Sequence, residues 1–186
     1  IFKLIKPFKK KINIEGDKSL SIRWALVASQ ATGKSKSFNL LKSEDVIDTL
    51  ECLKKLGIKI KLTNNFCEIT GNGLNGFKYK KNVILNAGNS GTLSRLIMGL
   101  LVHCKNQIKI IGDKSLSKRD FLRVTTPLKL FGASFKTNSG KLPITITGTN
   151  YSKPIKYSEK KGSAQCKSTV LLAALNTEGE TYIKAK

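Results

Sequence analysis

The chain has few of the residues that commonly bind metals. Its 186 residues include one histidine and four cysteines, and no two cysteines are close enough to form a CxxC pair. A single histidine and scattered thiols make no recognisable zinc-binding set. We therefore predict no metal site, no cofactor, and four reduced, buried cysteines. These residues are His103, Cys52, Cys67, Cys104 and Cys166.

Long hydrophobic runs are also absent. The longest apolar stretches, around residues 96–102 and 170–175, fall far short of the roughly 20 residues that span a bilayer. The chain starts at Ile1 without a signal-peptide pattern and stops at Lys186 inside a strand-like run. We expect a cytoplasmic protein that does not enter a membrane, and we expect this chain to be a fragment of it.

Acidic residues are scarce. There are 12 Asp and Glu against 34 Lys and Arg, which gives a formal net charge of +22. A charge of this size raises nucleic acid or an anionic membrane as partners. The lysines are spread through every segment and are not interleaved with aromatic residues, so the sequence disfavours nucleic acid. A basic nucleic-acid-binding module remains an alternative, which a steep salt dependence of DNA binding would support.

Arginine is nearly absent as well, with four among the 34 basic residues. The planar guanidinium grips carboxylates and phosphates with two parallel hydrogen bonds, which lysine cannot do. All four arginines fall in segments typical of anion-binding loops or their helices. We interpret them as markers of an anion site, with chance clustering as the alternative. They are Arg23, Arg95, Arg119 and Arg123.

The first third of the chain alternates between strand and helix patterns. A strand-like run over residues 1–14 ends at a turn, and helical spacing follows over residues 21–31. Ser43, followed by two acidic residues, predicts the start of a second helix that stops at Gly57. Two β-rich runs come next and predict a hairpin. These runs are residues 58–62 and 66–70.

The next block repeats this plan. The predicted elements are a strand at residues 82–85, a helix at 92–104, a strand at 107–111, a helix at 118–131 and a hairpin at 134–137 and 144–147. The sequence LKKLG around Gly57 returns as LKLFG around Gly132, 75 positions later. A third copy begins near Ile155, with a helix at 164–175 and a strand entry at Thr181. We predict an α/β (α+β) fold of repeated β-α-β-α-β-β units, of which about two and a half are present.

Three turns between a strand and a helix carry small and hydroxyl-bearing residues. Exposed amides and the dipole at a helix N-terminus favour phosphate or carboxylate, and Gly91 allows the backbone to approach a ligand closely. The hexapeptide GDKSLS supplies one of these turns and occurs again at residues 112–117, each time two residues before an arginine. Several such turns imply a polyanionic ligand or two anionic ligands side by side. The turns are Lys18-Ser19, residues 89–92 and Ser163-Ala164-Gln165.

Each of these features also has a structural interpretation. For Ser19 it is a helix N-cap, and for Gly88 and Gly91 it is ordinary turn geometry. For Arg95, which lies within a predicted helix, it is an ion pair. We favour the structural interpretation for Arg95 and weigh the two interpretations equally for the glycines.

Four blocks of the chain resemble, in order and spacing, the signature blocks of the 5-enolpyruvylshikimate-3-phosphate synthase family. They begin with GDKSLSIRWALVASQ at residue 16, NAGNSGTLSRL at residue 86, GDKSLSKRDFLRV at residue 112 and GSAQCKSTVLLAAL at residue 162. The resemblance covers essentially the whole chain but under half of the usual enzyme. It implies the enolpyruvyl transferase fold, with residues 15–186 as an N-terminal repeat domain whose third repeat is truncated. Residues 1–14 would be a strand that belongs to, or crosses toward, the missing C-terminal domain.

The resemblance also implies a reaction on the route to chorismate and the aromatic amino acids. The enolpyruvyl group of phosphoenolpyruvate passes to the 5-hydroxyl of shikimate 3-phosphate, and phosphate leaves. Both molecules carry a phosphate and a carboxylate, which agrees with anion-binding turns. The catalytic acid and base are expected in the missing part, so we assign none here. We expect this chain to be inactive alone and the full-length enzyme to be a monomer.

By resemblance, two overlapping sets of residues would bind the two substrates. The shikimate 3-phosphate set is Lys18, Ser19, Arg23, Ser163, Ala164 and Gln165. The phosphoenolpyruvate set is Lys18, Asn89, Gly91, Thr92, Arg119 and Gln165. In the family, glyphosate occupies the phosphoenolpyruvate site, and glycine at position 91 leaves room for it. We therefore expect the full-length enzyme to be sensitive to glyphosate.

Two positions depart from the family pattern. Asp120 follows Arg119 where many members have proline, and its negative charge is expected to lower anion affinity. Ala164 replaces a serine, so its contact would be through the backbone alone.

Related enzymes are alternatives. UDP-N-acetylglucosamine enolpyruvyl transferase shares the fold, but its loop cysteine is missing from GDKSLSKRDFLRV, and Lys18 is followed by serine where that family has asparagine. RNA 3′-phosphate cyclase, built on related repeats, is a weaker alternative. A folded but inert fragment is a further one.

Overall fold

The computed structural model describes residues 9–12, 14–160 and 162–184. The strand expected over residues 1–14 falls largely outside this range, and residues 9–12 and 14 form no strand. The helices are α1 Lys18–Gln30, α2 Glu44–Lys55, α3 Gly91–Leu100, α4 Leu122–Leu130 and α5 Ala164–Ala174, with short 3-10 turns η1 Leu101–His103 and η2 Leu116–Lys118. The strands are β1 Thr32–Ser37, β2 Lys59–Leu62, β3 Cys67–Asn72, β4 Val83–Asn86, β5 Ile108–Ile111, β6 Ser134–Asn138, β7 Lys141–Thr147, β8 Lys156–Ser158 and β9 Tyr182–Lys184.

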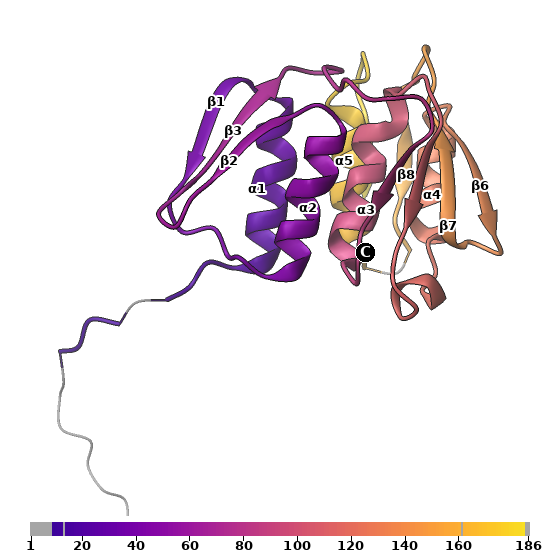
Figure 1. Cartoon of the computed structure of the whole chain (residues 1–186). Helices are drawn as coiled ribbons and strands as arrows, with labels where there is room; N and C mark the ends of the chain where they lie inside the picture. Colours follow the sequence, from indigo (N-terminus) through magenta and orange to yellow (C-terminus); the bar gives the residue numbers. More distant parts are fainter. Residues whose placement is uncertain (1–8, 13, 161, 185–186) are drawn as a thin grey trace, which may run out of the picture.

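The helices lie between two sheets (Figure 1). The sheet of β1, β2 and β3 is on one side, the sheet that contains β6 and β7 is on the other, and α1, α2, α3 and α5 run between them. One cluster of buried apolar residues joins the inner faces of these layers, and Leu26, Leu96, Phe121 and Ile144 belong to it. No helix in the described part of the chain has the length and apolar character that crossing a membrane requires.

The strand orders repeat along the chain. The first sheet has the order β1-β3-β2, and the second has β4-β5-β7-β6. In both, the strand before the hairpin (β1 or β5) pairs antiparallel with the second hairpin strand (β3 or β7). The third unit contributes β8 and β9, which pair in parallel as β4 and β5 do. The prediction of a repeated unit, present in about two and a half copies, is therefore confirmed.

Strand β1 has no counterpart among the elements predicted for the first unit. Its sequence TGKSKS lacks an apolar alternation, and none of its residues is buried. The strand forms because it pairs along its whole length with β3, from Thr32 opposite Asn72 to Ser37 opposite Cys67. Pairing with a buried neighbour thus overrides the weak local pattern.

The continuous helix predicted over residues 118–131 is wrong. The turn η2 ends at Lys118 and α4 begins at Leu122. Between them Arg119 is extended, with φ −75° and ψ 149°. The carboxylate of Asp120 accepts a hydrogen bond from the backbone N–H of Leu122 at 2.7 Å. Such a bond from side chain to backbone competes with helix continuation and starts a new helix instead.

The four cysteines are free and buried, as predicted. Burial raises the pKa of Cys52 to about 12 and that of Cys104 to about 11. Both thiols therefore stay protonated at neutral pH and act as small packing residues.

Helix α3 is the most enclosed element, since every one of its residues is buried. Gly99 is the point where it approaches α5. A Cβ atom at Gly99 would collide with the carbonyl oxygen of Thr169 and lie 3.1 Å from Cβ of Leu172. The backbones of α3 and α5 can therefore pack this closely only because residue 99 has no side chain.

Replacement of this glycine should force the two helices apart. We expect Gly99→Ala to lower the free energy of unfolding by about 1–3 kcal/mol, the usual cost of overpacking, although alanine gains about 1 kcal/mol in helix propensity. Urea denaturation measures the change. The exposed control Lys167→Ala on α5 should stay within about 0.5 kcal/mol of wild type, and a Gly99→Ala variant as stable as the control would contradict the close approach.

Candidate anion-binding site

Four helices begin around one cavity of about 290 Å³. Lys18 is the first residue of α1, Asp45 the second of α2, Gly91 the first of α3 and Gln165 the second of α5. Helix N-termini expose backbone N–H groups and carry partial positive charge, so their convergence favours anions. The lining residues are Lys18, Asp45, Asn89, Gly91, Thr92, Arg119 and Gln165.

This lining contains all six residues that the resemblance assigned to phosphoenolpyruvate. They come from four segments that are widely separated along the chain. The seventh residue, Asp45, was not predicted.

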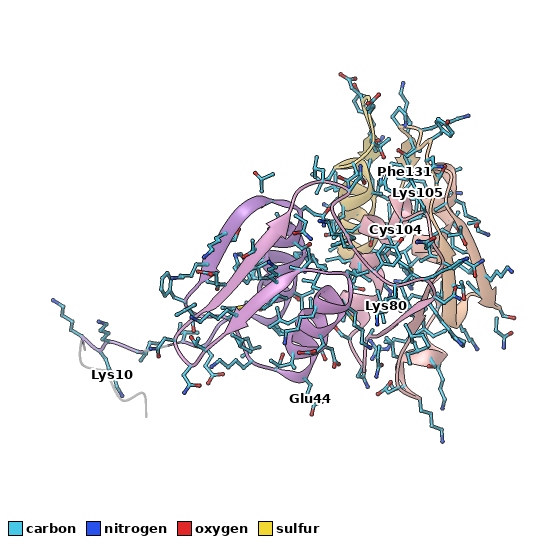
Figure 2. The ribbon with its side chains drawn as sticks, turned by 45° about the horizontal axis from the view of Figure 1, so that its top comes forward. Lys10, Glu44, Lys80, Cys104, Lys105 and Phe131 are labelled. Atoms are coloured by element: carbon cyan, nitrogen blue, oxygen red, sulfur yellow. The ribbon has the colours of Figure 1, made fainter. Side chains whose placement is uncertain are left out.

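A larger cavity, of about 790 Å³, lies elsewhere on the molecule. Cys104 and Lys105 line it, and Figure 2 shows them well away from Glu44, the first residue of α2 and the neighbour of Asp45. None of the residues predicted from the anion-binding turns lines the larger cavity. The smaller cavity at the helix starts is therefore the candidate site.

Helix α1 starts earlier than predicted. Asp17 is its N-cap, and the carboxylate accepts a hydrogen bond from the backbone N–H of Leu20 at 2.7 Å. Ser19 is therefore not the N-cap but lies in the first turn, where its carbonyl oxygen accepts a hydrogen bond from Arg23 at 3.2 Å. The early start places Lys18 in the first turn of α1, where it lines the cavity.

Both copies of GDKSLS use their aspartate in the same way. Asp113, like Asp17, accepts a hydrogen bond from the backbone N–H three residues later, in this case Leu116 at 2.6 Å. Asp113 also accepts a hydrogen bond from the side-chain amide of Asn89 at 2.6 Å. The repeated hexapeptide thus has a common local role in starting a helical turn, and its second copy also orients a residue of the cavity.

Lys18 is held by a carboxylate inside the site. Its Nζ lies 3.1 Å from Oδ2 of Asp45. The sequence suggested Asp45 as a first-turn charge of α2, and it has that position, but packing of α1 against α2 also brings it to Lys18. An anion that binds Lys18 must share the ammonium group with this carboxylate.

Arg119 is held by a neutral partner. Its Nη2 donates a hydrogen bond to Oδ1 of Asn89 at 2.8 Å. In the described part of the chain Arg119 makes no ion pair, and the carboxylate of the following Asp120 is engaged in starting α4. The positive charge of Arg119 is therefore not neutralised by a direct partner.

Gly91 is not an ordinary turn residue. It is the first residue of α3, after the N-cap Ser90. A Cβ atom there would lie 2.8 Å from Nη1 of Arg119 and 3.0 Å from Nη1 of Arg95. The missing side chain lets two guanidinium groups converge on the N-terminus of α3.

Gln165 connects α5 to α3 through both ends of its amide. Its Oε1 accepts a hydrogen bond from Nη1 of Arg95 at 2.7 Å, and its Nε2 donates to Oγ1 of Thr92 at 3.1 Å. The ion pair expected for Arg95 is wrong, because no carboxylate pairs with it among the described residues. Its guanidinium lies over the ring of Phe121 instead, 5.2 Å from the centroid.

The remaining residues of the predicted shikimate 3-phosphate set flank the cavity. Arg23 belongs to α1 and reaches α5, where its Nη2 donates a hydrogen bond to Oγ of Ser168 at 3.5 Å. Ser163 is the N-cap of α5, and its hydroxyl accepts a hydrogen bond from the backbone N–H of Cys166 at 3.2 Å. Ala164 follows it as an exposed first residue. These residues and Ser19 lie on the same two helices as Lys18 and Gln165 but do not line the cavity.

Comparison with known proteins identifies relatives over nearly the whole chain. The model of the family described as EPSP synthase (3-phosphoshikimate 1-carboxyvinyltransferase) matches residues 2–185. The chain is 45% identical over 173 residues to the 3-phosphoshikimate 1-carboxyvinyltransferase of Vesicomyosocius okutanii subsp. Calyptogena okutanii (strain HA), covering 93% of this chain and 40% of that protein. It is 41% identical over 177 residues to the enzyme of the same name from Streptococcus mutans, covering 94% and 41%.

A solved structure also shows similarity to this family. EPSP synthase from Acinetobacter baumannii superimposes with a TM-score of 0.89 at 39% identity, over 95% of this chain and 40% of that chain. The chain thus spans about 40% of the length of the relatives that it matches.

The close approach at Gly91 generates a prediction on anion binding. In Gly91→Ala the added methyl group displaces both guanidinium groups, and we expect the Kd for inorganic phosphate to rise at least about tenfold. The free energy of unfolding should change by less than about 1 kcal/mol, since Gly91 is the first residue of α3 and the full preference for alanine over glycine applies to the helix interior. Isothermal titration calorimetry and urea denaturation measure the two quantities.

The control is Lys109→Ala, which places alanine at an exposed position of β5 outside the cavity lining. We expect it to leave both the phosphate affinity and the free energy of unfolding close to the wild-type values. Wild-type phosphate affinity in Gly91→Ala would contradict the interpretation of Gly91.

Proposed function

The chain belongs to the EPSP synthase family, and we propose that it is the N-terminal part of an enolpyruvyl transferase. The whole enzyme would transfer the enolpyruvyl group of phosphoenolpyruvate to the 5-hydroxyl of shikimate 3-phosphate and release phosphate. The observation that carries the proposal is the cavity itself. Six residues from four distant segments, which the family pattern assigns to one anionic substrate, line one cavity at four helix N-termini.

The phosphoenolpyruvate site is assigned to this cavity. Arg119 and Lys18 would share the negative charges of the substrate, and the N-terminus of α3 at Gly91 and Thr92 would supply backbone N–H groups. Gln165 would offer its side-chain amide as a donor. Asn89 orients Arg119 through the hydrogen bond between them.

The shikimate 3-phosphate site is assigned to the adjoining starts of α1 and α5. Arg23 and Ser19 on α1, and Ser163 and Ala164 on α5, border the same end of the molecule as the cavity. Lys18 and Gln165 line the cavity and belong to these two helices as well. They would therefore contact both substrates, which places the reacting atoms next to each other.

The contribution of this chain to the reaction is positioning and charge neutralisation. Two polyanionic substrates repel each other, and a cationic site lowers the free energy of holding them together. When C2 of phosphoenolpyruvate accepts the hydroxyl, the groups that bind its phosphate also bind the leaving phosphate. Among alternatives, no feature of the described residues favours a nucleotide sugar as the acceptor.

The assignment of shikimate 3-phosphate can be tested by calorimetric titration into this chain at low and moderate salt. We expect saturable binding, and we expect the Lys18→Ala, Arg23→Ala double variant to weaken it by about 100-fold or more, because each charged hydrogen bond contributes roughly 1.5–3 kcal/mol. The control is Lys109→Ala, Lys136→Ala, which removes the same charge from exposed positions on β5 and β6. Equal affinity of the two double variants would contradict the site.

A second test concerns turnover. The titratable side chains that line the cavity are those of Lys18, Asp45 and Arg119, and Asp45 is paired with Lys18. We therefore expect the 186-residue chain to release no phosphate from phosphoenolpyruvate and shikimate 3-phosphate. The Streptococcus mutans relative serves as the positive control, and a rate above buffer from the purified chain would overturn this expectation.

A further inference from the structure

Arg95 is a buried cation without a carboxylate partner among the described residues. Its exposed fraction is 8%. Its hydrogen-bond acceptors are neutral: Oε1 of Gln165 at 2.7 Å and the carbonyl oxygens of Asp120 at 3.4 Å and Gly91 at 3.5 Å. Its Nε is fully buried and has no hydrogen-bond partner. A guanidinium group in this environment has lost most of its hydration, and the carboxylate that attracts it, that of Asp120, lies beyond ion-pair distance.

Burial of such a charge is unfavourable, because neutral dipoles replace bulk water incompletely. Burial and the repulsive charges of Arg123 and Arg119 lower the pKa of Arg95, and the nearby charge of Asp120 offsets part of this effect by raising it. The ring of Phe121 offsets part of the cost. The unliganded protein therefore keeps Arg95 in place at an energetic disadvantage, which implies a compensating interaction in another state of the molecule.

The cavity adjoins this buried charge. Arg95 lies one helical turn after Gly91, and its Nη1 is 3.0 Å from the position of a Cβ atom at Gly91, a residue of the cavity lining. Its partner Gln165 lines the cavity as well. An anion in the cavity would lie close to Arg95 across a region of low dielectric constant, where charges interact more strongly than in water.

Arg95 also determines which way the amide of Gln165 faces. Because the guanidinium can only donate hydrogen bonds, it requires Oε1 of Gln165 on its side. The NH₂ group of Gln165 is then turned toward Thr92 and the cavity. The anion site therefore receives a donor and not an acceptor from this residue.

We propose that Arg95 is the buried countercharge of the cavity, a positioning residue that stabilises a bound phosphate- or carboxylate-bearing anion and fixes Gln165 as a donor to it. Arg95 does not line the cavity, so it acts through the electric field and through Gln165. The inference deepens the proposed function by naming a residue behind the phosphoenolpyruvate site, and it rests on that function for the identity of the ligand. The competing explanation is that Arg95 only links α3 to α5.

The two explanations predict opposite effects on stability and binding. Arg95→Met keeps a long apolar stem and removes the charge. If Arg95 is a countercharge, the ligand-free variant should melt no lower than wild type, while the Kd for inorganic phosphate should rise at least about tenfold. If Arg95 is a structural link, the variant should melt lower and bind phosphate as before.

The experiment uses the 186-residue chain with sodium phosphate and with phosphoenolpyruvate as probes, at an ionic strength held constant with sodium chloride. Thermal melts give stability and calorimetry gives Kd. The control Lys109→Met removes one positive charge from an exposed residue of β5. We expect it to bind both probes as wild type does, which separates a local effect of Arg95 from the effect of net charge.

Arg95→Lys decides the matter if Arg95→Met does not fold. Lysine keeps the positive charge but lacks the planar guanidinium group that donates two parallel hydrogen bonds. The Kd of Arg95→Lys for phosphate should therefore lie within about tenfold of the wild-type value. A larger loss in Arg95→Lys, or unchanged phosphate affinity in a folded Arg95→Met, overturns the proposal. So does a wild-type chain that binds neither probe.

The two probes distinguish failure of this inference from failure of the proposed function. If wild type binds phosphate but not phosphoenolpyruvate, the assigned substrate is wrong, and the phosphate data still decide the role of Arg95. If phosphoenolpyruvate binds equally well to wild type and Arg95→Met, the role of Arg95 is wrong and the proposed substrate stands.

Discussion

The packing of α3 against α5 is the constraint on which the candidate site depends. Gly99 brings the two backbones together, and the corresponding helices of the repeats begin at the same end of the molecule. Gly91 and Gln165, which belong to different repeats, therefore line the same cavity. The partly buried hydrogen bond between Arg95 and Gln165 makes this geometry specific, because it connects α3 to the start of α5 directly.

Much of the fold could be predicted because the repeat leaves local signals. LKKLG and LKLFG each mark a helix end followed by a strand, and a hairpin forms after both. β1 could not be predicted, because TGKSKS carries no apolar period and forms a strand through its partner β3. The break before α4 depends on one hydrogen bond, which the carboxylate of Asp120 accepts from the backbone N–H of Leu122. The surrounding residues have a helix-forming composition, so the sequence does not indicate the break. Asp45 was missed for another reason: its contact with Lys18 depends on how α2 packs against α1. Arg95 was singled out, but the ion pair predicted for it was wrong, because its acceptors outside α3 are the side-chain amide of Gln165 and the backbone carbonyl of Asp120.

The local distribution of charge matters more for this site than the net charge of +22. Lys18 is already paired with Asp45, and Asn89 is already bonded to Asp113. These carboxylates lower the net positive charge of the cavity and hold its donors in place before a ligand arrives. Arg119 and Arg95 differ from Lys18, since their hydrogen-bond acceptors are all neutral. Under the proposed role, an anion in the cavity would compensate the charges of these two guanidinium groups, of which Arg95 is the buried one.

This arrangement separates binding from chemistry within the molecule. Helix N-termini, guanidinium groups and amide donors hold anions well, but they cannot accept and return a proton near neutral pH. Asp45 is the one carboxylate in the lining, and it is paired with the ammonium group of Lys18. The described residues of the cavity are therefore suited to holding anions. Under the proposed function, proton transfer would require groups of a different kind.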